Sequence, residues 1–205
     1  MENKNVLIIG CGGLGGAVAE DLIRIGGCNL TLIDFDKFDE SNLNRQRFCN
    51  KDSIGKYKAE EVAIQLNKIR STKILFYKDL QFEDTATCRA AVRNASVVID
   101  ATDNIQTRRL ISRICMEENA MLVSGAVNGW MGFQMNQRPG SSYVYDYFCG
   151  LDENTPQPES ADAISMVCTN IASLMGMETY KYLNDKENEM RDDTLILNFM
   201  VNFIL

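Results

Sequence analysis

Residue types that bind phosphate stand close together near the start of this chain. Glycines occupy four positions of the run Gly10-Cys11-Gly12-Gly13-Leu14-Gly15, directly after the apolar segment 6–9. A turn of this kind between a buried strand and a helix aims free backbone N–H groups and the helix dipole at a phosphate. Gly10 would allow the tight turn, Gly12 the close approach of backbone to phosphate, and Gly15 the close packing of helix on strand. The run therefore predicts a nucleotide site.

A carboxylate and two cations follow this glycine run. Asp34 ends the apolar segment 30–33, a place from which a carboxylate can accept hydrogen bonds from ribose hydroxyls. Asp36, two residues later, is expected to be a turn residue. Arg45 and Lys58 can supply the fixed cations that stabilise charge on a reacting phosphate, with Asn42 and Gln46 orienting them. A nicotinamide ring would instead need an apolar slot.

A second carboxylate is expected at the same edge of the sheet. The buried strand 97–100 is followed by Asp103, and the carboxyl ends of parallel strands face a common crevice. Asp103 could hold Mg²⁺ against the phosphates there. Alternatively, it could cap the helix that begins near Asn104, and the two roles are compatible.

This combination resembles the activating-enzyme family, which includes the bacterial adenylyltransferases for the thiamin and molybdopterin sulfur carriers and is related to ubiquitin-activating enzymes. The similarity covers roughly residues 4–135 in order, with a weaker echo over 164–183. It is carried by residues 10–15, 34–36, 41–46, Lys58 and 102–104. In that family, ATP and Mg²⁺ are used to adenylate the C-terminal Gly-Gly of a small ubiquitin-like protein.

The resemblance implies a role for each matching residue. The glycines Gly10, Gly12, Gly13 and Gly15 would bind the phosphates and Asp34 the ribose, while Ser41, Asn42, Arg45 and Lys58 would line the polyphosphate, Asp103 would hold magnesium, and Asn104 would contact the nucleotide. Arg45, Lys58 and Asp103 are the predicted catalytic residues. The implied cofactors are ATP and Mg²⁺, and the implied partner is a sulfur-carrier protein ending in Gly-Gly.

Three other functions remain open. An NAD(P)-dependent oxidoreductase would explain the glycines and Asp34, but it leaves Arg45, Lys58 and Asp103 without a role and lacks an obvious proton donor. A related enzyme could activate a small carboxylate on tRNA. A binding module could hold ATP or a ubiquitin-like tail without completing the chemistry.

Cysteine and histidine usage limits the chemistry. The chain has no histidine, which removes histidine acid–base catalysis and histidine metal ligands. Its seven cysteines form no Cys-x-x-Cys pair, so no structural zinc is expected. Family members that pass their cargo to a thiol carry it in a loop in front of the nucleotide, where residues 158–163 have none. Cys168 lies later, in a helical stripe, and is expected to be a small buried hydrophobe more than a covalent thiol.

Composition favours one soluble domain spanning 1–205. The chain has 205 residues, 45% of them hydrophobic, and a net charge of −7, which argues against a nucleic-acid partner. Apolar runs long enough to span a membrane and a signal-peptide pattern are both missing, so a cytoplasmic location is expected. The family's arginine from the partner subunit, upstream of the first strand, has at best a weak substitute in Lys4.

Strand–helix alternation predicts an α/β fold with a doubly wound, mostly parallel, Rossmann-like sheet over 1–125. An antiparallel C-terminal extension is expected over 126–205. Its expected parts are a hairpin of 130–137 and 143–148, a loop over 150–162, a helix around 164–177 and a closing strand over 195–205. The apolar segment 199–205 would promote aggregation unless covered, and subunits pair in the family, so a symmetric homodimer is expected.

Overall fold

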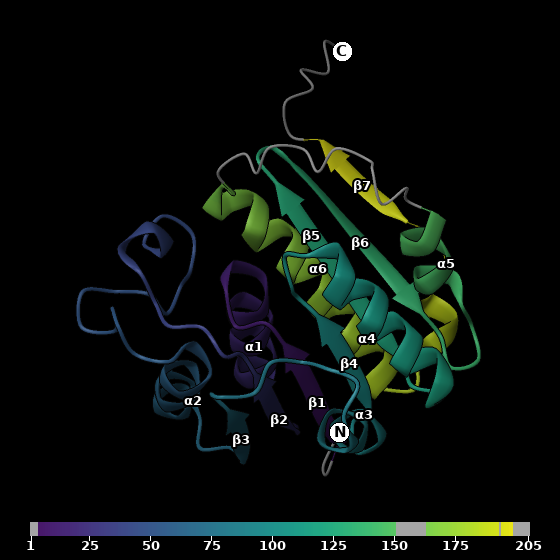
Figure 1. Cartoon of the computed structure of the whole chain (residues 1–205), viewed down its shortest axis with the longest axis horizontal. Coiled ribbons are helices and arrows are strands. Elements are labelled where there is room, and N and C mark those ends of the chain that lie inside the picture. Colours follow the sequence, from purple (N-terminus) through teal and green to yellow (C-terminus); the bar gives the residue numbers. More distant parts are fainter. Residues whose placement is uncertain (1–3, 151–162, 193, 199–205) are drawn as a thin grey trace.

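The computed structural model describes residues 4–150, 163–192 and 194–198. Within these residues the chain forms a seven-stranded sheet in the order β3-β2-β1-β4-β5-β6-β7 (Figure 1). The strands are β1 (Lys4–Ile9), β2 (Cys28–Ile33), β3 (Ile74–Tyr77), β4 (Val97–Asp100), β5 (Leu122–Asn128), β6 (Met131–Gln137) and β7 (Leu195–Asn198).

The strand pairing confirms the predicted fold class. β1 lies between β2 and β4 and is parallel to both, so Ile9 has Ile33 on one side and Asp100 on the other. β3 and β5 extend the parallel part on either side. β6 is antiparallel to β5 and β7 is antiparallel to β6, which gives the predicted antiparallel extension.

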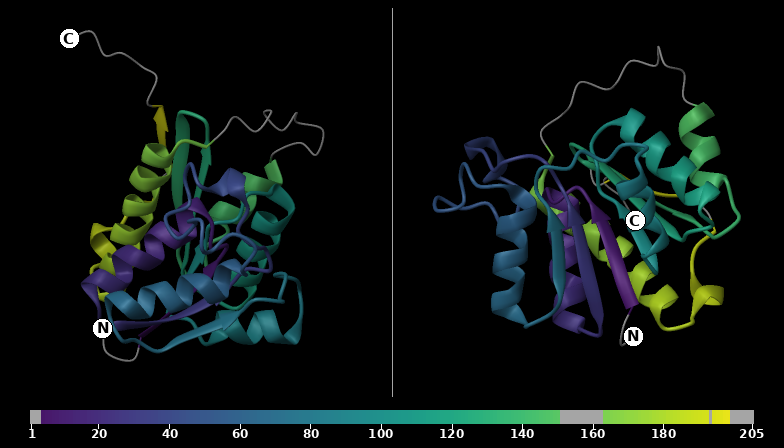
Figure 2. Two further views of the ribbon diagram at one scale, coloured as in Figure 1. Left: turned by 90° about the vertical axis from the view of Figure 1, so that its left-hand side faces the viewer. Right: turned by 60° about the horizontal axis from the view of Figure 1, so that its bottom comes forward.

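Helices cover both faces of the sheet (Figure 2). One core lies beneath α1 (Gly13–Ile25), α2 (Lys58–Ile69) and α6 (Ser165–Leu183), and the other beneath α3 (Ala86–Arg93), α4 (Ile105–Glu117) and α5 (Tyr143–Gly150). Two short 3₁₀ turns, η1 (Glu40–Asn42) and η2 (Glu187–Glu189), complete the described elements. Successive β1 residues alternate between the two cores, with Val6 and Ile8 in the first and Leu7 and Ile9 in the second.

The apolar faces of α1 and α2 are buried except at the last residue of each helix. In α1, Leu14, Val18 and Leu22 are buried, whereas Ile25 is half exposed one residue before Gly26 ends the helix at φ +80°. Ile69 is likewise the exposed last residue of α2. The helix predicted after the apolar segment is confirmed, and it starts within the glycine run, at Gly13.

The predicted hairpin partner over 143–148 is wrong, because that segment is helix α5. The hairpin is formed instead by β5 and β6, with Gly129 at φ +56° in the turn. The alternating tyrosines suggested a strand, but Val144 and Phe148, four residues apart, are the buried residues of the helix.

The other C-terminal predictions are only partly covered. The helix around 164–177 is confirmed as α6, and β7 confirms the beginning of the closing strand. The predicted loop lies, apart from Gly150, outside the described residues, as does the segment 199–205. Among the helices that the structure describes, none has the length and apolar character needed to cross a membrane.

Candidate functional site

The glycine run lies at the carboxyl end of β1, and two of its positions require glycine. Gly10 has φ +90°, and a Cβ atom there would lie 2.7 Å from the Ala101 carbonyl oxygen in the loop after β4. A Cβ on Gly15 would lie 1.8 Å from the Gly10 carbonyl oxygen. The run is therefore held tightly between β1, the loop after β4 and the first turn of α1.

The N-terminus of α1 is open to an anion. Gly12 is its N-cap residue and offers no side-chain cap, and the first turn contains no acidic residue. The first backbone N–H groups of a helix have no partner within that helix, and they carry its positive dipole end. These features suit a phosphate group.

Asp34 is bound directly to the glycine run. The backbone N–H of Cys11 donates to Asp34 Oδ2 at 2.6 Å, and the N–H of Asp36 donates to Oδ1 at 2.8 Å. Asp34 is largely buried, and this desolvation raises its pKa; the hydrogen bond from Cys11 and the charge of Lys58 act in the opposite direction. The carboxylate is thus fixed at the edge of the sheet beside the glycines.

Asp36 holds Lys58 at the same edge of the sheet. The Lys58 Nζ atom lies 3.0 Å from Asp36 Oδ2, and the Lys58 N–H donates to the Asp36 carbonyl oxygen at 2.8 Å. The Lys58 side chain is only 11% exposed, although lysine side chains are rarely buried. The ion pair with Asp36 and this burial together restrict where the ammonium group can lie. Asp36, expected from the sequence to be a turn residue, therefore also pairs with a cation of the predicted site. The signal in the sequence for this ion pair was the position of Asp36, two residues after Asp34 and before Lys58 in the chain.

The segment 41–48 lies over the glycine run and the start of α1. A Cβ on Gly12 would lie 3.4 Å from Gln46 Nε2, and one on Gly13 would lie 3.5 Å from the Arg45 carbonyl oxygen. Arg45 is half-buried, and its guanidinium donates to the Ser41 carbonyl oxygen at 3.1 Å and to Asn44 Oδ1 at 2.8 Å. The Arg45 carbonyl oxygen and Cγ atom therefore lie beside Gly13, whereas the guanidinium is held by residues of its own segment.

Two further polar residues of this segment differ in exposure. Asn42 is buried and closes a capping box with Asp39, accepting from the Asp39 N–H at 3.2 Å, whereas Ser41 is exposed. Gln46 is 7% exposed, and its Oε1 has no hydrogen-bond partner among the described residues. Gln46 is expected from the sequence only to orient the cations. An unpaired buried acceptor beside Gly12 marks it as a further polar group of the site.

Asp103 lies in the loop that follows β4. Because β4 is the parallel neighbour of β1, this loop lies at the same edge of the sheet as the glycine run. The Asp103 side chain is exposed and has no hydrogen bond or ion pair with any described residue. The alternative of Asp103 as a helix cap is wrong. Asn104 is the N-cap residue of α4 and accepts from the Thr107 N–H at 2.7 Å. The carboxylate of Asp103 is therefore available to a ligand.

Cys168 lies beside the glycine run, which its sequence position did not indicate. A Cβ on Gly13 would lie 3.2 Å from Cys168 Sγ. The thiol is 3% exposed, and burial raises its pKa while the charge of Arg45 opposes the increase. The expectation of a small buried residue is confirmed. Cys168 reaches the glycines because it lies in the first turn of α6, which packs on α1.

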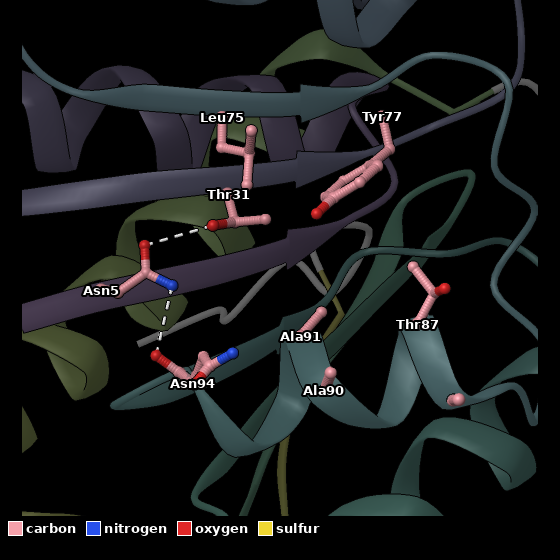
Figure 3. Close-up of a pocket in the computed structure, with 9 residues that line it drawn as sticks. Asn5, Thr31, Leu75, Tyr77, Thr87, Ala90, Ala91 and Asn94 are labelled. Carbon is pink, nitrogen blue, oxygen red and sulfur yellow. Dashed lines mark hydrogen bonds between the residues drawn. The ribbon is translucent and has the colours of Figure 1, made fainter.

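A hollow of about 390 Å³ lies elsewhere, between α3 and the first three strands (Figure 3). Thr31 donates there to Asn5 Oδ1 at 3.2 Å, and Asn5 donates to the Asn94 carbonyl oxygen at 3.4 Å. None of the predicted site residues lines it. The predicted site residues lie instead at the carboxyl ends of β1, β2 and β4 and in the segments that follow these strands.

Known proteins resemble this chain over most of its length. The family model described as "ThiF family" matches residues 1–203. The molybdopterin-synthase adenylyltransferase of Escherichia coli is 34% identical over 193 residues, covering 89% of this chain and 74% of that protein. The adenylyltransferase and sulfurtransferase MOCS3 of Dictyostelium discoideum is 31% identical over 97% of this chain, which spans 47% of that relative.

Solved structures agree in fold. The E. coli enzyme MccB with ATP has a TM-score of 0.73 at 18% identity, covering 99% of this chain and 66% of that one. At this identity the likeness concerns the fold alone, whereas the family model and the E. coli relative carry the classification. This chain belongs to the ThiF family, as its resemblance to activating enzymes predicted.

Proposed function

We propose that this chain is an ATP- and Mg²⁺-dependent adenylyltransferase. Its substrate would be the C-terminal Gly-Gly carboxylate of a small ubiquitin-like sulfur-carrier protein, in thiamin- or molybdopterin-type sulfur transfer. The observation that carries the proposal is the hydrogen bond of 2.6 Å from the Cys11 N–H, in the glycine run, to Asp34 Oδ2. Arg45 lies beside Gly13 of the same run. The molybdopterin-synthase adenylyltransferase of E. coli, a relative at 34% identity, supports it.

The nucleotide would bind along the edge of the sheet. The N–H groups of the glycine run and of the first turn of α1 would take the phosphates, and Asp34 would accept the ribose hydroxyls. Ser41, Asn42, Arg45 and Lys58 would surround the polyphosphate, and Asn104, whose side-chain oxygen caps α4, would contact the nucleotide with its remaining groups.

Magnesium fits one carboxylate of the site. Asp103 is exposed, has no partner among the described residues, and offers the hard oxygen ligands that Mg²⁺ prefers. When bound, the ion would supply neutralising charge at the phosphates. Asp103 would hold it, together with phosphate oxygens, at the carboxyl end of β4.

The reaction would be an in-line displacement. An oxygen of the tail carboxylate forms a bond to the α-phosphorus, the bond from that phosphorus to the bridging oxygen breaks, and pyrophosphate leaves with its electron pair. The carboxylate is already ionised at neutral pH, so no general base is needed, which suits a chain without histidine. Arg45 and Lys58 would offset charge on the phosphates. The product is an acyl-adenylate.

A binding experiment and an exchange assay test the proposal. Calorimetry should show binding of Mg-ATP in preference to NADH, because fixed cations surround the phosphates. Tight NADH binding without Mg-ATP binding would overturn the assignment. ATP–pyrophosphate exchange should then depend on a carrier ending in Gly-Gly. Exchange supported by a small carboxylate, with transfer to tRNA, would favour the tRNA-modifying alternative, and nucleotide binding without any exchange would favour a binding module.

A further inference from the structure

A buried ion pair lies beneath the loop that carries Asp103. Arg108 Nη1, from α4, is 3.1 Å from Asp100 Oδ2, at the end of β4, and the side chains are 5% and 1% exposed. Neither residue belongs to the predicted site. Replacing a buried pair by apolar residues is often neutral or stabilising, so its presence needs a reason besides stability.

The hydrogen bonds around this pair converge on one residue, Thr102. Asp100 Oδ1 accepts from the Thr102 N–H at 3.0 Å and from Thr102 Oγ1 at 2.7 Å. Arg108 Nη2 donates to the Thr102 carbonyl oxygen. The pair thus holds the backbone N–H, the side chain and the carbonyl of a single loop residue.

The remaining bonds of the pair anchor it to the neighbouring strand. Ser124 Oγ donates to Asp100 Oδ2 at 2.7 Å, and Arg108 Nη1 donates to the Gly125 carbonyl oxygen at 2.9 Å. Both acceptors of Asp100 are therefore occupied, and the arginine fork reaches β5 and the loop at once. A buried polar network whose members are all paired is rigid.

Asp103 stands directly after this fixed residue. Its other neighbour, Asn104, is fixed by the cap of α4, whereas the side chain of Asp103 has no partner among the described residues. The place of its carboxylate therefore depends on the backbone on either side. We propose that Asp100 and Arg108 are positioning residues that hold Thr102, and thereby aim the Asp103 carboxylate at the metal of the nucleotide. This rests on the proposed function, in which Asp103 binds Mg²⁺.

Two hydroxyls bound to the same carboxylate give a matched test. Thr102→Val removes one of the three hydrogen bonds that join the pair to the loop. Ser124→Ala removes a bond of equal length, 2.7 Å, and a longer one of 3.4 Å from Arg108 Nη1, neither of which reaches the loop. Both variants lose a hydroxyl hydrogen bond to the same buried carboxylate, so both should be less stable than the wild type. Amide hydrogen exchange of the unliganded protein should accelerate over 101–104 in Thr102→Val and stay at the wild-type rate there in Ser124→Ala. Arg108→Lys, which keeps the charge but not the fork, should behave like Thr102→Val.

The second readout is metal affinity. With ATP present, Mn²⁺ replaces Mg²⁺ as a probe, and bound Mn²⁺ is followed by electron paramagnetic resonance. Thr102→Val and Arg108→Lys should raise the half-saturating Mn²⁺ concentration roughly tenfold, and Ser124→Ala should leave it within about twofold of wild type. Thermal unfolding of each variant separates this effect from lost stability.

The outcomes are distinct. Equal loss of Mn²⁺ affinity in Thr102→Val and Ser124→Ala, or unchanged exchange over 101–104 in Thr102→Val, would overturn the inference and leave the pair a purely structural feature. If wild-type protein with ATP bound no Mn²⁺ while the exchange rates still differed, the assignment of Asp103 to the metal would fall, and the inference with it. That result would also count against the proposed function.

Discussion

Asp34 combines two features that usually oppose each other. It is buried, which raises its pKa, yet backbone N–H groups of Cys11 and Asp36 both donate to its carboxylate. A raised pKa means that the folded chain takes up this proton at a pH where the unfolded chain does not. The contribution of Asp34 to stability therefore falls as pH rises from its pKa in the unfolded chain through its higher pKa in the folded chain. Above that pH the folded chain retains the ionised carboxylate at an energetic cost. The proposed role of Asp34 as the ribose acceptor would give that cost a functional reason.

This predicts a pH dependence of nucleotide binding. On acidification, affinity for Mg-ATP should begin to fall at a higher pH than the usual pKa of an aspartate would give, because protonated Asp34 accepts ribose hydroxyls poorly. In Lys58→Met the onset should move to still higher pH, since the Lys58 charge lowers the pKa of Asp34. Calorimetric titrations across the acidic range measure the onset. The same onset in Asp34→Asn would show that another group is responsible.

Asp103→Asn tests the predicted metal ligand. The variant should fold normally because the side chain is exposed and has no partner among the described residues. Carrier-dependent ATP–pyrophosphate exchange should drop by roughly a hundredfold, on the scale of lost electrostatic stabilisation. Circular dichroism and thermal unfolding provide the control for folding. Near-normal exchange would remove Asp103 from the mechanism.

Cys168→Ala should leave chemistry largely intact. The thiol is 3% exposed and burial raises its pKa, so little thiolate forms at neutral pH. We expect the acyl-adenylate to be the final enzyme-bound product, with both exchange and carrier thiocarboxylation retained in the variant. A reductant-sensitive adduct trapped between Cys168 and the carrier would contradict this.

At the scale of elements, the site depends on how closely α1 approaches β1. The helix begins at Gly13, and its first turn is packed against the glycine run and the loop after β4. Segment 41–48 and the first turn of α6 then cover the glycines from outside, with Phe48 against Gly16 and Cys168 against Gly13. The geometry of the proposed phosphate site is thus set by α1, the loop after β4, segment 41–48 and α6, and not by the glycine run alone.

Gly15→Ala should show this dependence. The added methyl would lie 1.8 Å from the Gly10 carbonyl oxygen, and a backbone atom cannot move aside as a side chain would. We expect a loss of about 3 kcal/mol in the free energy of unfolding, together with loss of Mg-ATP binding. Gly150→Ala is the control, because a Cβ there meets no atom of the described residues within 4 Å. Comparable unfolding curves for the two variants would refute the packing argument.

At the scale of the whole molecule, apolar side chains remain exposed where the sheet turns antiparallel. Trp130 and Met131, in the β5–β6 hairpin, are 46% and 47% exposed, and Ile196 of β7 is 59% exposed. Exposed apolar surface of this kind is typical of protein contacts. The sheet therefore ends in a part suited to association, opposite the β3 edge (Figure 1).

The expected assembly is a symmetric homodimer, as in the family that the sequence resembles. Light scattering at micromolar concentration should give twice the chain mass of 23.1 kDa. Met131→Lys should weaken association if this surface takes part, whereas Met177→Lys, at a similarly exposed position on α6, should not. A sharp monomer mass for the wild type would contradict the expectation.

Several features follow from the sequence because they depend on local spacing. Glycines after an apolar run place a phosphate-binding turn, and Asp34 and Asp103 were placed because parallel strands present their carboxyl ends at one edge. Strand–helix alternation likewise determined the doubly wound topology, since right-handed crossovers leave few arrangements. Each of these inferences depends only on residues that are close in the sequence, or on the general rule for the handedness of crossovers.

Tertiary structure decided the features that depend on distant contacts. Residues 143–148 fit a strand by their tyrosine alternation and a helix by Val144 and Phe148, and burial of the latter pair in the second core selected the helix. Cys168 came to lie beside Gly13, and Arg108 to pair with Asp100 and reach Gly125, only when α6 and α4 packed on the sheet. Sequence patterns report which face of an element is apolar, but which residues meet across two faces is set by packing of the whole chain.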